Sequence, residues 1–204
     1  QVSYNDTIEI AANVTDNGII DTVLANVTLP GGSNQLLTLE NGTSHPTKFN
    51  YSFSVNKNIG QHNVTFIAND TNNNINKVKK TIFDVMDPIN PNLINLLPPL
   101  GYQVNTSQNL TIGITIIDEI AASVAIAQIN YPNGTNTNIT LNLADSSSGI
   151  FNITFSSDYP GEYNITFFGN DSSNNINGTE KTYFSIQGIK TMQISPANNA
   201  NANG

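Results

Sequence analysis

One stretch of this chain occurs twice, and the two copies define the unit from which the chain is built. Residues 60–76 read GQHNVTFIANDTNNNIN, and residues 161–177 read GEYNITFFGNDSSNNIN. Each copy alternates apolar and polar residues and then enters an Asn/Asp-rich segment, which is the pattern of a half-buried β-strand followed by a turn. The similarity extends outward on both sides at a spacing of about one hundred residues, so the repeating unit is a small β domain.

The rest of each repeat also reads as short strands. The first alternating strand has inward positions Ile8, Ile10, Ala12 and Val14 in one copy and Leu110, Ile112, Ile114 and Ile116 in the other. Six or seven such strands in about one hundred residues, with no helical period, are typical of an immunoglobulin-like (Ig-like) sandwich. We therefore predict an all-β protein of two tandem Ig-like Greek-key β-sandwich domains. Tyr163, two residues after Gly161, is placed like the tyrosine corner of such folds, whereas the first repeat has His62 there.

The ends of the repeats differ, and the difference sets the predicted boundaries. Residues 1–87 form the first domain, which lacks its own first strand, and residues 88–102 form a Pro-rich linker and the first strand of the second domain. Residues 103–188 complete that domain, and residues 189–204 form a C-terminal extension. In this extension, Met192, Ile194 and Pro196 resemble Ile94, Leu96 and Pro98, so it looks like the first strand of a further repeat.

Two interpretations fit these ends. The chain is either a window cut from a longer array of repeats, or a subunit whose C-terminal strand completes the first domain of the next subunit at an open sheet edge. The second arrangement is head-to-tail and does not close, so it would produce filaments. The chain has no initiator Met and no basic and apolar leader, which indicates a processed or excised piece.

Composition excludes several classes of function. Charged residues make up 11% of the chain, Arg is absent, and the formal net charge is −8, so binding to nucleic acid is not expected. The chain has no Cys for a disulfide, a zinc knuckle or a thiol nucleophile. No apolar run approaches the ~20 residues that span a bilayer.

The densest short motif is Asn-x-Ser/Thr, the acceptor sequence for N-glycosylation. A chain rich in Asn and Thr would form roughly six such triplets by chance, and alternation along strands raises that number. We predict that several carry glycans on an exported protein. The fifteen candidates are Asn5, Asn13, Asn26, Asn41, Asn50, Asn63, Asn69, Asn105, Asn109, Asn133, Asn138, Asn152, Asn164, Asn170 and Asn177.

Acidic turns offer weak candidates for Ca²⁺, the only cofactor considered. Asp16, Asp70, Asp118 and Asp171 lie in Asn/Asp-rich turns, where carboxylate oxygens could coordinate the ion. The alternative is that each side chain caps the backbone of its own turn. No complete calcium-loop motif is present.

The sequence gives little support to an enzyme. His45 lies in a Gly-Thr-Ser-His-Pro loop, and His62 begins a strand where the other copy has Tyr, so neither is marked as a catalytic base. A glycosidase carboxylate pair is not excluded. The strand aromatics are predicted to lie in the core, with Phe168 on the polar face; they are Phe49, Tyr51, Phe53, Phe66, Phe151, Phe155, Tyr163 and Phe167.

These motifs together resemble the tandem Ig-like repeats of archaeal cell-surface proteins, including S-layer proteins and surface filaments. The residues that carry the resemblance are Ile-Ser-Pro-Ala-Asn at 194–198, more loosely residues 97–101, Gly-Glu-Tyr-Asn-Ile-Thr at 161–166, and the Asn-Asp-x-x-Asn-Asn turns. The resemblance implies an extracellular location, N-glycans and self-assembly.

We therefore expect a non-enzymatic structural subunit of an extracellular glycosylated filament or S-layer, with other copies of itself as partners. The alternative is an adhesin or a carbohydrate-binding module of a larger surface protein, which would need an exposed aromatic platform or a calcium site. A third possibility is an accessory module of a surface enzyme whose catalytic residues lie outside this chain.

Overall fold

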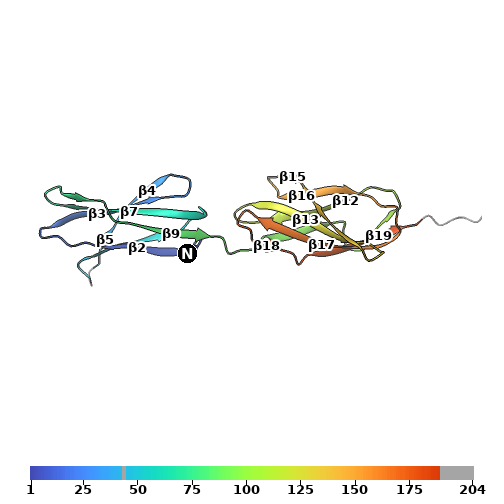
Figure 1. Ribbon diagram of the computed structural model, residues 1–204, viewed down its shortest axis with the longest axis horizontal. Helices are drawn as coiled ribbons and strands as arrows, with labels where there is room; N and C mark the ends of the chain where they lie inside the picture. Colours follow the sequence, from blue (N-terminus) through green and yellow to red (C-terminus); the bar gives the residue numbers. More distant parts are fainter. Residues whose placement is uncertain (43–44, 189–204) are drawn as a thin grey trace, which may run out of the picture. The chain divides into compact units, whose positions relative to one another are not determined.

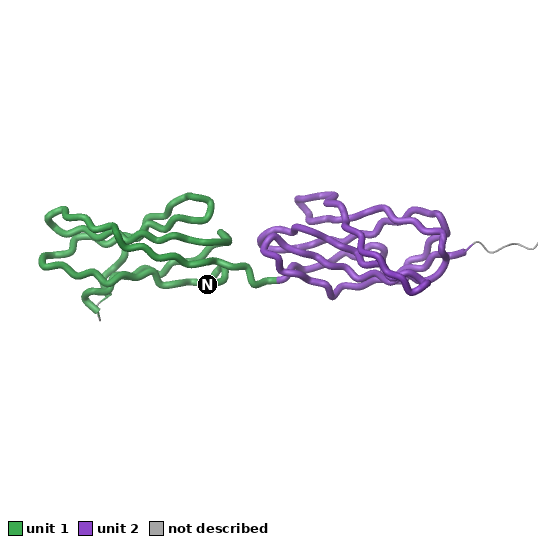
Figure 2. Tube along the Cα trace, viewed as in Figure 1, with its two compact units in different colours: residues 1–89 green, residues 90–204 purple. Residues whose placement is uncertain are grey.

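The computed structural model describes residues 1–42 and 45–188, and it divides the chain into two compact units. Unit 1 comprises residues 1–89 and unit 2 comprises residues 90–204 (Figure 2). Each is built from strands, and no helix long and apolar enough to cross a membrane occurs among the described residues.

Unit 1 consists of two sheets packed face to face (Figure 1). One sheet has the order β1-β9-β7-β3-β4, with β8 also paired to β7, and the other has the order β2-β6-β5. The bounds are β1 Val2–Ser3, β2 Thr7–Asn13, β3 Ile20–Thr28, β4 Asn34–Thr38, β5 Glu40–Asn41, β6 Lys48–Ser54, β7 Gly60–Asp70, β8 Ile75–Asn76 and β9 Lys80–Met86.

Unit 2 repeats this arrangement with one additional strand. Its larger sheet has the order β11-β19-β17-β13-β14, with β18 paired to β17, and its second sheet has the order β10-β12-β16-β15. The bounds are β10 Asn92–Leu97, β11 Tyr102–Asn105, β12 Leu110–Ile117, β13 Ala122–Asn130, β14 Asn136–Thr140, β15 Asn142–Asp145, β16 Ile150–Phe155, β17 Gly161–Asp171, β18 Ile176–Asn177 and β19 Lys181–Gln187.

The strand registers of the two units correspond pair for pair. Ile8 lies opposite Phe53 in unit 1, and Leu110 lies opposite Phe155 in unit 2, so a residue of β2 or β6 corresponds to the residue 102 positions later. Gly60 lies opposite Val85, and Gly161 lies opposite Ile186, so residues of β7 and β9 correspond at 101 positions. The repeat seen in the sequence is therefore a repeat of the fold.

The core of unit 2 is organised around Tyr163, which is fully buried and stacks on Phe184. The Tyr163 hydroxyl donates a hydrogen bond to the carbonyl oxygen of Tyr159 at 2.8 Å. This contact to the backbone four residues upstream confirms the predicted tyrosine corner. In unit 1 the same position is held by His62, whose buried ring stacks on Phe83 at a centroid distance of 4.7 Å.

One aromatic residue of unit 1 that was predicted in the core is exposed. Tyr51 has the same strand phase as Phe49 and Phe53, yet its side chain is 41% exposed. On one side of β6, the two residues of β5 pair only with Asn50 and Phe49. Beyond that point, β6 has no neighbour on this side among the described residues, so the sheet does not cover Tyr51.

Candidate functional site

The clearest difference between the units is the edge of the smaller sheet. In unit 2, β10 pairs antiparallel with β12 and places Leu93 opposite Ile116. In unit 1, β2 corresponds to β12 and pairs with β6, but within residues 1–42 and 45–89 no strand lies on its other side. We call this side of β2 the β2 edge. An uncovered edge presents backbone N–H and C=O groups that can pair with an added strand.

Unit 2 shows what a strand at this place buries. Leu93 of β10 is only 3% exposed and belongs to the hydrophobic core of the unit. It reaches the core across Gly169 of β17, because a Cβ atom added to Gly169 would collide with the Cδ2 atom of Leu93. The strand is therefore a full part of the sandwich.

The positions covered by the extra strand in unit 2 are partly uncovered in unit 1. The residues Leu110, Ile114, Ile116, Phe167 and Phe184 are buried, whereas their counterparts Ile8, Ala12, Val14, Phe66 and Phe83 are only half-buried. These counterparts come from both sheets, and in unit 2 the strands that carry the five buried residues, β12, β17 and β19, all contact β10. Half-buried aromatic and aliphatic side chains on the inner face of a sandwich mark a surface that a strand can cover.

A hollow lies at one end of the β2 edge. It has a volume of about 220 Å³ and is lined in part by Val14, Asp16, Ala68, Asp70 and Asn76. Their counterparts in unit 2 are Ile116, Asp118, Gly169, Asp171 and Asn177. In unit 2, the segment that enters β10 passes this place, since the Asn177 side chain binds the carbonyl oxygen of Pro91.

The predicted assembly strand, with Met192, Ile194 and Pro196, lies outside the described residues. Its role therefore stays a prediction.

The acidic turns have the geometry of backbone caps. Asp70 accepts hydrogen bonds from the backbone N–H groups of Asn72 and Asn74 and from the Asn74 side chain, and these bonds lower the pKa of Asp70, with the Asn74 side chain as the largest cause. Asp171 accepts the equivalent hydrogen bonds from the backbone N–H groups of Ser173 and Asn175 and from the Asn175 side chain.

The other two acidic candidates also cap turns. Asp16 accepts from the Gly18 N–H, and Asp118 accepts from the N–H groups of Ile120 and Ala121. All four carboxylates therefore have a structural role, as one of the two interpretations predicted.

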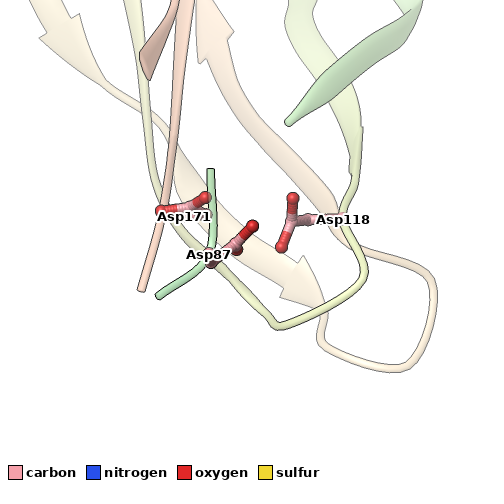
Figure 3. A group of neighbouring side chains, drawn as sticks. All are labelled: Asp87, Asp118 and Asp171. Atoms are coloured by element: carbon pink, nitrogen blue, oxygen red, sulfur yellow. The ribbon is translucent and has the colours of Figure 1, made fainter. Parts of the chain in front are cut away.

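Figure 3 labels Asp118 and Asp171 of unit 2 together with Asp87, which lies in the segment after β9 of unit 1. Asp87 accepts a hydrogen bond from the backbone N–H group of Ile89 at 3.0 Å. Because the hydrogen bonds of Asp118 and Asp171 are those of turn caps, they do not by themselves identify an ion site, and calcium binding stays a prediction.

None of the fifteen glycosylation candidates is buried. Nine are exposed, namely Asn5, Asn13, Asn41, Asn63, Asn105, Asn109, Asn133, Asn138 and Asn164, and the other six are half-buried. The side-chain nitrogen of Asn177, the atom that would carry a glycan, donates instead to the Pro91 carbonyl at 3.0 Å. Asn133 contrasts with it, because its side-chain oxygen accepts from Thr135, the hydroxyl residue of its own triplet, and its nitrogen points to no described acceptor.

The two histidines do not lie together. His45 is exposed in the loop before β6, and His62 is 1% exposed, with its Nδ1 atom 3.2 Å from the carbonyl oxygen of Gly60. His62 therefore packs in the core of unit 1, as a corner residue does.

Comparisons with known proteins support the fold. No protein-family model and no curated protein matches the sequence. A tetra-tandem repeat from the extending region of a large adhesion protein is similar over 90% of this chain, with 14% identity and a TM-score of 0.57. This chain covers 46% of that structure.

Two further structures are similar over most of their own length. The titin A168169 structure shares 8% identity, with a TM-score of 0.46 and 93% of each chain covered. The amphioxus IgVJ-C2 molecule shares 12% identity, with a TM-score of 0.44, 90% of this chain covered and 97% of that chain covered. The support for the fold comes from the tetra-tandem repeat structure, and its 14% identity shows the fold alone. The chain is an all-β protein of two tandem Ig-like β-sandwich domains.

Proposed function

We propose that this chain is a non-enzymatic structural subunit of an extracellular, glycosylated assembly. Copies join head to tail, and residues 189–204 of one copy add a strand to the β2 edge of the next. The observation that carries the proposal is the contrast between β12, which is covered by β10, and β2, whose equivalent side is uncovered in the described part of unit 1.

The energetics favour strand addition at this edge. Each buried aliphatic side chain contributes about 1.5–3 kcal/mol, and each backbone hydrogen bond about 0.5–1.5 kcal/mol, before the cost of ordering the segment. The half-buried Phe66 and Phe83 already form the floor on which such a strand would lie. Since each copy carries both such an edge in its described part and such a segment in its sequence, the contact repeats without closing and yields a filament.

An extracellular location is part of the same proposal. It is supported by the fifteen acceptor triplets, none of which is buried, and by the resemblance to archaeal surface repeats. The similar adhesion-protein structure is a tandem array from an extending region, and that architecture is compatible with a repeating surface module.

Electron microscopy of the purified chain tests the proposal. We expect filaments from the full chain and separate particles from a variant that ends at Gly188. A full chain that stays monomeric at high concentration would contradict head-to-tail assembly, and so would filaments formed equally well by both proteins. Intact-mass measurement of native material tests the prediction that the chain carries glycans. A measured mass equal to that of the bare chain would contradict it.

A second function, carbohydrate binding, is favoured by one surface of unit 2. Tyr131, Asn133 and Tyr159 line a hollow of about 450 Å³ together with Pro132 and Pro160, and Tyr159 is 72% exposed. Exposed aromatic rings are surfaces on which sugars can stack. Binding of the chain to a glycan array that is lost in Tyr159→Ala would support this function, and an array without any bound chain would contradict it.

A further inference from the structure

Two side chains of unit 2 hold the segment that contains β10. The Asn177 side-chain nitrogen donates to the carbonyl oxygen of Pro91 at 3.0 Å, and the Thr182 hydroxyl donates to the carbonyl oxygen of Pro98 at 2.9 Å. The two carbonyl groups lie just outside the two ends of β10. The pair therefore fixes both the position and the register of the strand.

Unit 1 has the same two residue types at the corresponding positions. Asn76 of β8 corresponds to Asn177, and Thr81 of β9 corresponds to Thr182. The Asn76 side-chain oxygen accepts from the Val78 N–H at 3.2 Å, as the Asn177 oxygen accepts from the Thr179 N–H at 3.1 Å. The two amides are thus held by equivalent turns.

In unit 1 these donors have nothing to hold within the described residues. Both Asn76 and Thr81 are exposed, whereas Asn177 is half-buried and Thr182 is 4% exposed. No described residue accepts a hydrogen bond from the Asn76 nitrogen or the Thr81 hydroxyl. Asn76 and Thr81 correspond to the two residues that bind the ends of β10 in unit 2. Their exposed donors therefore indicate that an added strand is the ligand.

The C-terminal extension has a segment of the required length. Residues 91–98 read PNLINLLP, and residues 189–196 read IKTMQISP, so both carry Pro at the last position and an aliphatic residue two positions before it. The segment carries Lys190 and no acidic residue, whereas the hollow beside the β2 edge contains Asp16 and Asp70. The charges of the segment and the hollow are complementary.

We infer that Asn76 and Thr81 are the clamps that bind residues 189–196 of a second copy. The Asn76 amide binds the carbonyl group of Ile189, and the Thr81 hydroxyl binds that of Pro196. This register places Ile194 where unit 2 has Leu96, and Ser195 opposite Ala11, as Leu97 lies opposite Gly113. The inference rests on the proposed function and adds the residues and the register that define the contact.

The size of one facing pair supports this register. In unit 2, Leu93 packs against Gly169, and a Cβ atom added to Gly169 would collide with the Leu93 side chain. Unit 1 has Ala68 in place of Gly169, so a leucine at this place would collide with its methyl group. The proposed register instead places Thr191, which is smaller than leucine, against Ala68. A register shifted by three residues would instead place Ile194 against Ala68 and is disfavoured.

Disulfide trapping tests the register in the full chain, which has no native Cys. The double variant Ala11→Cys/Ser195→Cys carries both cysteines in each copy. It is expected to form disulfide-linked multimers when the assembled protein is oxidised. The control Ala11→Cys/Asn198→Cys places its thiols together only in the shifted register and is expected to stay largely uncrosslinked. Cross-linking of the control alone would overturn the inference while leaving strand addition intact.

A size exchange gives a second test that does not depend on cross-linking. Thr191→Leu is expected to raise the critical concentration for assembly at least tenfold, and Thr191→Leu/Ala68→Gly is expected to restore most of the loss. Unchanged assembly in Thr191→Leu would overturn the inference.

The clamps themselves are tested by substitution. Thr81→Val and Asn76→Ala are each expected to raise the critical concentration about fivefold, since each removes one hydrogen bond. The exposed Thr71→Val serves as the matched control and should assemble like the native chain. Native-like assembly of both clamp variants would overturn the inference, whereas a native chain that never assembles would contradict the proposed function itself.

Discussion

The Thr182 hydroxyl donates a hydrogen bond to the carbonyl oxygen of Pro98 at 2.9 Å, in a part of unit 2 where Thr182 is only 4% exposed. A valine at this position keeps the shape but leaves a buried carbonyl without its donor. We predict that Thr182→Val lowers the free energy of unfolding of unit 2 by about 1–3 kcal/mol. The exposed counterpart, Thr81→Val, should change the stability of the monomeric chain by less than about 0.5 kcal/mol.

Hydrogen exchange reports on the stability of each unit separately, through the amides of β19 in unit 2 and of β9 in unit 1. Exchange in β19 should accelerate in Thr182→Val, and exchange in β9 of the monomer should stay unchanged in Thr81→Val. Equal acceleration in both variants would mean that Thr81 already supports unit 1 without an added strand.

The tyrosine corner makes a separate prediction for unit 2. Tyr163→Phe keeps the stacked ring but removes the hydroxyl that binds the Tyr159 carbonyl and lies 2.7 Å from the Ser157 hydroxyl. We expect the free energy of unfolding to fall by about 1–2 kcal/mol. Urea unfolding, monitored by hydrogen exchange of the β17 amides, measures this change. His62→Phe in unit 1 is the comparison, because the His62 ring also stacks on a phenylalanine, Phe83. A Tyr163→Phe variant as stable as the native chain would show that the corner contributes nothing.

The hydrogen bonds of Asp70 predict that the stability of the folded chain depends on pH. Its hydrogen bonds to Asn74 hold the pKa of Asp70 below its ordinary value of 3.8. The folded pKa is therefore lower than the unfolded one, so the stabilisation is complete above about pH 4 and is lost as the pH falls through the folded pKa. Asp70→Asn should be less stable than the native chain at pH 7, and the difference should shrink in acid. A difference that stays constant between pH 7 and pH 2 would contradict this role.

The acceptor triplets should not be used equally. Asn177 donates its side-chain nitrogen to the Pro91 carbonyl, so in the folded chain that nitrogen is not free to carry a glycan. Asn133 lies exposed in the turn between β13 and β14, with its oxygen bound to Thr135. We predict high occupancy at Asn133 and low occupancy at Asn177 in glycopeptide mass spectrometry of native protein. Comparable occupancy at both would show that glycans are attached before the Asn177 contact forms.

The alternation of apolar residues was sufficient to predict the sandwich, because period-two patterns place Ile112, Ile114 and Phe167 on one face whichever strands they pair with. The position of Tyr163 likewise predicted a contact to the backbone upstream. Tyr51 was predicted in the core and is exposed, since its phase is inward but β5 is too short to cover it. Burial depends on neighbouring strands, which a local pattern does not contain.

The residues that hold β10 were missed for a related reason. The sequence marks Asn177 only as a glycan acceptor and does not mark Thr182, because a contact to Pro91 or Pro98 joins positions more than eighty residues apart. A signal was present in the repeat, since Asn76 and Thr81 recur as Asn177 and Thr182.

An electron cryomicroscopy map of the assembled chain at side-chain resolution tests strand addition most directly. We expect a strand paired antiparallel with β2 on the side away from β6, formed by residues 189–196 of a neighbouring copy, with Ser195 opposite Ala11. A map in which the β2 edge is empty, or is covered by a segment of the same copy, would contradict it.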